Sequence, residues 1–143
     1  MRTLVAVAIL WPALTAAQGR CPWLNTATAG GVLEGAVVVK VAPTNCEFTR
    51  KIGDHEAILS IDVNSAKARA THCGPGAEPL KGIGNQAQAC TYEGKAGWTA
   101  QQVAGTVRDQ AFLVRIETND ASLARMARER TVRAAEQVAG ILF

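Results

Sequence analysis

Alternating apolar and polar residues predict antiparallel strands along the middle of the chain. The clearest case is residues 57–64, where the apolar Ala57, Leu59, Ile61 and Val63 alternate with the polar Ser60, Asp62 and Asn64, as in a strand with one buried face. Two more alternating runs, 103–108 and 112–117, flank a turn at Asp109 and predict a β-hairpin. Further strands are predicted at residues 37–41, 46–50 and 86–92.

Helix signals lie at both ends of this region. Residues 25–34 predict a short helix, and Asn25 or Thr26 can cap its start. Asp120 caps a long helix that runs to about Leu142. Its apolar residues recur at the three- and four-residue spacing of an amphipathic helix, at Leu123, Met126, Ala127, Ala134, Val138 and Ile141.

The order of these elements predicts an α+β fold. We expect an antiparallel β-sheet with a short N-terminal helix and a long C-terminal helix packed on one face. Residues 65–85 break the pattern with glycine and proline, and so long a connection favours either a functional loop or a short helix near 66–70. The phenylalanines Phe48, Phe112 and Phe143 are expected in the core.

The N-terminal segment has the layout of a secretory signal. A basic start is followed by an apolar stretch at residues 4–14 and small side chains at 15–17. The apolar stretch is shorter than the about 20 residues that span a bilayer. We expect cleavage after Ala17, or after Gly19, which leaves residues 18–143 as a single disulfide-stapled domain. The alternative is an uncleaved membrane anchor.

The net charge is +3 for the whole chain and +2 once the leader with Arg2 is removed, which is too balanced to predict binding to nucleic acid or to an anionic membrane. The rest of the chain has no run of apolar residues long enough to suggest a stable membrane span after cleavage. We therefore expect an exported protein that is periplasmic or secreted.

Four cysteines follow the leader, and an even number in a small exported domain predicts two disulfides. Three pairings are possible. We favour Cys21 with Cys46 and Cys73 with Cys90, because each pair ties an irregular segment to a predicted strand.

A metal site is the alternative use of these cysteines. It would combine Cys73 and Cys90 with His55 or His72, but no C-x-x-C or H-x-x-x-H spacing supports it. The segment Gly82-Ile83-Gly84 lacks the third glycine of a dinucleotide-binding loop and predicts a tight turn. We therefore expect neither a metal nor a cofactor.

Several short motifs are spaced along most of the chain beyond the leader. They are Cys21-Pro22-Trp23-Leu24, Gly30-Gly31-Val32-Leu33, Cys46-Glu47-Phe48-Thr49 and Gly82-Ile83-Gly84-Asn85-Gln86-Ala87. With the hairpin and the C-terminal helix, this pattern resembles exported bacterial domains of unknown function whose fold is similar to the PsbP-like α/β sandwich. The resemblance implies that fold and carries over no catalytic residues.

Arg130 breaks the pattern of the C-terminal helix, since it falls on the apolar face between Met126 and Ala134. Its stem can pack there while the guanidinium reaches solvent. Alternatively, the side chain is buried and paired with a carboxylate such as Glu117 or Asp62.

No motif identifies an activity. We expect a non-enzymatic periplasmic or envelope module that binds a partner protein or a small ligand, with Arg130, Trp23 and Trp98 as candidate binding residues. The alternative is a small secreted hydrolase that uses His55 or His72. An enzyme of that kind would place one histidine in a concave site, within about 3 Å of a partner group.

Overall fold

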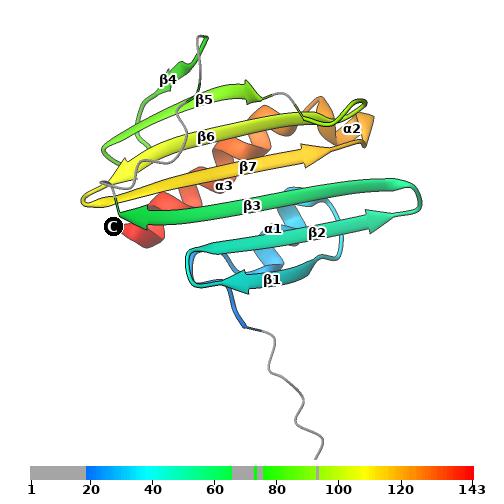
Figure 1. Cartoon of the computed structure of the whole chain (residues 1–143), viewed down its shortest axis with the longest axis horizontal. Helices are drawn as coiled ribbons and strands as arrows, with labels where there is room; N and C mark the ends of the chain where they lie inside the picture. Colours follow the sequence, from blue (N-terminus) through cyan, green and yellow to red (C-terminus); the bar gives the residue numbers. More distant parts are fainter. Residues whose placement is uncertain (1–18, 66–72, 74–75, 93) are drawn as a thin grey trace, which may run out of the picture.

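A computed structural model of the chain describes residues 19–65, 73, 76–92 and 94–143. Seven antiparallel strands form one sheet in the order β1-β2-β3-β7-β6-β5-β4 (Figure 1). The strands are β1 (Val38–Ala42), β2 (Asn45–Ile52), β3 (His55–Ser65), β4 (Glu78–Leu80), β5 (Gln86–Tyr92), β6 (Thr99–Val107) and β7 (Gln110–Thr118). The predicted leader at residues 1–17 lies outside the described residues.

The sheet consists of two meanders that meet between β3 and β7. Strands β1 to β3 follow one another along the chain, as do β4 to β7, and each neighbouring pair is antiparallel. The helices are α1 (Thr26–Leu33), the single turn α2 (Ala121–Ala124) and α3 (Ala127–Leu142). The predicted α+β class is confirmed.

One hydrophobic cluster joins the helices to the sheet. The buried members from β3 are Ala57, Leu59, Ile61 and Val63, the apolar half of the predicted alternation. Helix α1 contacts β2 and β3, and α3 contacts β6 and β7; Figure 1 draws both helices behind the sheet. We call the side of the sheet that carries these buried residues the core face, and the opposite side the outer face.

The short helix begins as predicted, whereas the long one is interrupted. The Asn25 side chain accepts a hydrogen bond from the Thr28 N–H at 2.7 Å and so caps α1. The prediction of one helix from Asp120 to Leu142 was wrong. Met126, at φ −108° and ψ 3°, departs from helical geometry, and its N–H bonds to the Leu123 carbonyl three residues back, which separates α2 from α3.

The core assignment was wrong at the C-terminal end of α3. Ile141 and Phe143 are 63% and 65% exposed, although Phe48 and Phe112 are buried as expected. The last turn of α3 lies beside the β6–β7 turn, where the strands end (Figure 1), and the Arg108 guanidinium is 5.9 Å from the Phe143 ring centroid. Helical periodicity predicts which residues share a face, but not how far the sheet extends beneath them.

The long connection between the two meanders holds a strand that the sequence pattern missed. Strand β4 pairs with β5, so residues 65–85 are not wholly irregular. Its Pro79 is tolerated because β4 is an edge strand. The helix suggested near 66–70 lies outside the described residues.

Both predicted disulfides are confirmed. Cys21 is bonded to Cys46, and Cys73 to Cys90. Each bridge attaches a segment of irregular backbone to a strand, β2 in the first case and β5 in the second. None of the described helices combines the length and hydropathy needed to cross a bilayer.

Candidate functional site

Residues directly opposite one another on neighbouring strands form rows across the outer face. One row runs from Asp62 on β3 through Leu113 and Ala104 to Gln88 on β5. The adjacent row, nearer the β6–β7 turn, consists of Asn64, Ala111, Thr106 and Gln86. Side chains on a strand alternate between its two faces, so the residues of these two rows point away from the core face.

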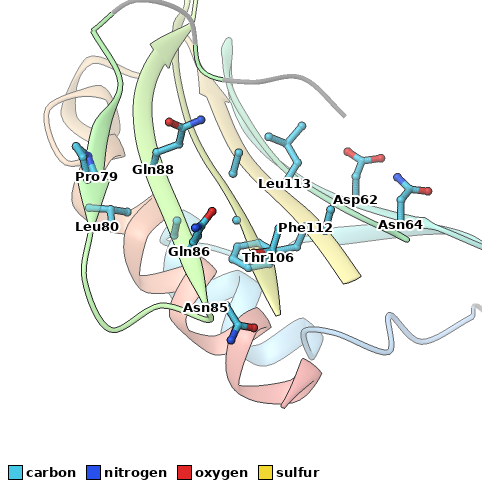
Figure 2. Close-up of a pocket in the computed structure, with 14 residues that line it drawn as sticks. Asp62, Asn64, Pro79, Leu80, Asn85, Gln86, Gln88, Thr106, Phe112 and Leu113 are labelled. Carbon is cyan, nitrogen blue, oxygen red and sulfur yellow. The ribbon is translucent and has the colours of Figure 1, made fainter. Parts of the chain in front are cut away.

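A cavity of about 500 Å³ lies over these two rows, within the range of about 300–1,000 Å³ that is usual for small-molecule sites. Figure 2 shows the Asp62, Asn64 and Leu113 side chains rising on one side of the sheet, with Pro79 and Leu80 of β4 at the far margin. The lining residues are Asp62, Asn64, Pro79, Leu80, Asn85, Gln86, Ala87, Gln88, Ala104, Gly105, Thr106, Ala111, Phe112 and Leu113.

Small side chains in the central strands explain the hollow. Ala104 and Ala111 occupy the middle of the two rows, while longer side chains flank them on β3 and β5. Gly105 lies between the rows, opposite Phe112, and a Cβ there would come within 2.5 Å of the Phe112 ring. The ring fills the space on the core face, so β6 passes under the cavity as a thin floor.

The cavity offers hydrogen bonds and one negative charge. Asp62 is the one ionisable residue among the described lining residues, and its Oδ1 accepts a hydrogen bond from Asn45 Nδ2 at 2.9 Å. Four amides and a hydroxyl supply further donors and acceptors, although Asn85 Oδ1 already accepts from the Arg108 N–H at 2.6 Å. The described lining contains no cysteine, serine or histidine that could act as a nucleophile or base.

The row next to the cavity contains a cation that protein groups already hold. Arg115 donates from Nη2 to Gln102 Oε1 at 3.1 Å, and its guanidinium lies 4.2 Å from the Tyr92 ring centroid. Its Nη1 is 3.8 Å from Glu117 Oε1. At the end of this row, Cys90 carries the second disulfide. Tyr92 and Glu117 belong to the following row, on the side away from the cavity, and Arg115 does not line the cavity.

A second polar cluster lies on the core face and was missed by the sequence analysis. Arg50 is 2% exposed; its Nη1 donates to the Leu33 carbonyl and its Nη2 to Asp120 Oδ2, both at 2.7 Å. The Arg50 guanidinium, together with Ser122, holds the pKa of Asp120 well below its usual range. The cluster joins β2, the end of α1 and the start of α2, so its role is structural.

Arg130 pairs with neither of the carboxylates proposed for it. Its side chain is 21% exposed, and it donates to Glu34 Oε1 at 2.6 Å and to the Gly31 carbonyl at 3.2 Å. The alternative of a buried pair with Glu117 or Asp62 was wrong, because α3 passes beside the end of α1 at this point and Glu34 is the partner. Arg130 therefore ties the two helices together at the surface.

We expect Arg130→Met to lower the free energy of unfolding by about 1 kcal/mol or less. The variant keeps an apolar stem and leaves Glu34 within reach of water, and partly exposed ion pairs contribute little. Urea denaturation checks this, with Arg133→Met, which removes the exposed pair to Glu129, as the control. A loss of 3 kcal/mol or more would show that Arg130 is part of the buried structure.

The other candidate residues lie apart from the cavity. Trp23 is half-buried and packs against the hydrophobic cluster, and half-buried Trp98 has the Lys95 ammonium 5.0 Å from its ring centroid. His55 is exposed at the start of β3, and its side chain makes no hydrogen bond to the described residues. His72 lies outside those residues.

In the part of the chain that the structure describes, no three His, Cys, Asp or Glu side chains lie close enough together to hold a metal ion. The PsbP-like resemblance stays a prediction. Comparisons with family models, with curated proteins and with solved structures find no match to this chain.

Proposed function

We propose that the protein is an exported, non-enzymatic binding module that holds a small polar ligand in the cavity on its outer face. The cavity itself is the observation that carries the proposal. It has the volume of a small-molecule site, an apolar floor and a margin of amides, the usual combination in ligand pockets.

The position of the cavity in the fold also supports binding. We infer that α1 and α3 together cover the core face, so that no helix among the described residues covers the outer face of the central strands. Strands β3, β7, β6 and β5 are each paired on both edges, so the rows that line the cavity are held in fixed register. A preformed site of this kind avoids the entropic cost of ordering loops on binding.

Export is supported by the crosslinks and by the predicted leader. Two disulfides in a chain of 143 residues are typical of an oxidising compartment. In such a compartment, the periplasm or the exterior, we expect the ligand to be a small molecule or a group on an envelope component. Among the described residues the hydrolase alternative has no comparable support, because exposed His55 does not line the cavity and His72 lies outside those residues.

Filling the cavity should abolish binding. Ala104 is at the centre of the lining, between Leu113 and Gln88, and we expect Ala104→Trp to weaken any ligand of this site by at least about tenfold. Ligands are found by screening a mixed fragment library against the labelled protein by NMR. The expected shifts are confined to the two lining rows.

The matched control is Ala42→Trp, at the exposed edge strand β1. Ala42 lies opposite Asn45, which lies opposite Asp62, so it belongs to an extension of the same row outside the cavity. Circular dichroism and unfolding midpoints check that both variants fold. Binding that survives Ala104→Trp, or shifts that map elsewhere on the protein, would count against the proposed site.

A further inference from the structure

We infer that the ligand of this cavity is a small organic cation, whose ammonium or guanidinium group pairs with Asp62. The inference rests on the proposed function, since it assigns a chemical class to the ligand of the same site. It follows from the charge, the hydrogen bonds and the dimensions of the cavity.

The charge of the lining selects the sign of the ligand. Asp62 supplies a carboxylate, and the other described lining residues are amides, a hydroxyl or apolar groups. A half-buried carboxylate without a cation is costly to desolvate when a neutral ligand covers it, whereas a cationic group compensates it. An anionic ligand would add repulsion to that cost.

The protein orients this carboxylate without neutralising it. Asn45 holds Oδ1, which fixes the orientation of the side chain on β3. Among the described residues, no arginine or lysine forms an ion pair with Asp62. Arg115, in the next row, is held by Gln102 and Glu117 instead. The part of the cavity lined by Asp62 is therefore a position for an external cation.

The dimensions specify the rest of the ligand. Asp62 on β3 and Gln88 on β5 are three strand spacings apart, about 14 Å. Between them the floor is apolar, formed by Leu113 and Ala104. The site thus fits a molecule with a cationic head at Asp62, an aliphatic stem over the two central strands, and a hydrogen-bonding tail at Gln88.

Three probes of equal length separate charge from shape: amino-octanol, octanediol and hydroxyoctanoate. Titrations followed by NMR should show amino-octanol binding at least about tenfold more tightly than octanediol, with hydroxyoctanoate the weakest. Added salt should reduce the affinity for the amine and leave that for the diol unchanged. Equal affinity for amine and diol in the wild type would overturn the inference.

Variants at Asp62 provide the second test. Asp62→Asn keeps an acceptor for Asn45 and should remove the preference for the amine, whereas Asp62→Glu should retain it. Glu47→Gln, which removes a negative charge on β2 outside this cavity, is the control and should change nothing. A preference that persists in Asp62→Asn would also overturn the inference. If the diol binds in the cavity with the same affinity as the amine, the assignment of a cationic ligand is wrong, but the cavity remains a binding site. The site itself is decided separately by Ala104→Trp.

Discussion

Asp120→Asn should lower the free energy of unfolding by about 3–5 kcal/mol at neutral pH. The substitution keeps the shape of the side chain and an acceptor for the Ser122 N–H, but it leaves Arg50 without its counter-ion. Arg50 is 2% exposed, so water cannot replace the lost carboxylate. Denaturant unfolding of the two forms measures the difference.

The pH dependence distinguishes loss of the ion pair from loss of a helix cap. Because the pKa of Asp120 is lowered in the folded state, the unfolded chain takes up this proton first as the pH falls. The stability that the carboxylate supplies is complete above the ordinary aspartate pKa of about 3.9 and is lost progressively below it. We expect the wild type to lose stability below about pH 4 more steeply than Asp120→Asn.

The control for this prediction is Asp109→Asn, in the exposed turn between β6 and β7. It removes the same charge from the chain without touching a buried partner, and we expect its effect to stay within about 0.5 kcal/mol. A loss below about 1 kcal/mol in Asp120→Asn would mean that Arg50 finds another partner or reaches water.

Removal of the first disulfide, by the double substitution Cys21→Ala and Cys46→Ala, should cost about 3 kcal/mol. The bridge closes a loop with a sequence separation of 25, and the unfolded chain gains the corresponding entropy when the bridge is removed. Cys46 is fully buried in the hydrophobic cluster, so the lost sulfur adds a small packing term in the same direction.

The second disulfide provides the comparison. Its separation is 17, and removing Cys73 and Cys90 together should cost a similar amount, again about 3 kcal/mol. Urea unfolding of both double variants and of the fully reduced wild type measures the two contributions. An unchanged midpoint after removal of either bridge would contradict the entropic account for that bridge.

Local patterns in the sequence predicted elements better than the contacts between them. The alternation in residues 57–64 and the capping oxygens of Asn25 and Asp120 are properties of neighbouring residues, and they correspond to β3 and to the starts of α1 and α2. The candidate cavity depends on strand order, which places Asp62, Leu113, Ala104 and Gln88 in one row across four strands. No short window of sequence contains that order.

Arg50 was predictable from the sequence, although it was overlooked. It follows Cys46 and Phe48 at the same two-residue spacing, so the alternation that buries these two also places Arg50 on the core face. A charge at such a position calls for a partner, and the partner comes from the distant Asp120. By contrast, the pairing of Arg130 with Glu34 depends on how α1 and α3 cross, which the helical pattern does not specify.

Ligand binding should stabilise the junction between β3 and β7, where the two meanders meet. Each meander contains its own disulfide, and no disulfide crosses from β3 to β7. A ligand held between Asp62 and Gln88 contacts both meanders at once. Its binding free energy therefore opposes their separation, and exchange of the β3–β7 backbone amides with solvent should slow as the ligand saturates the site.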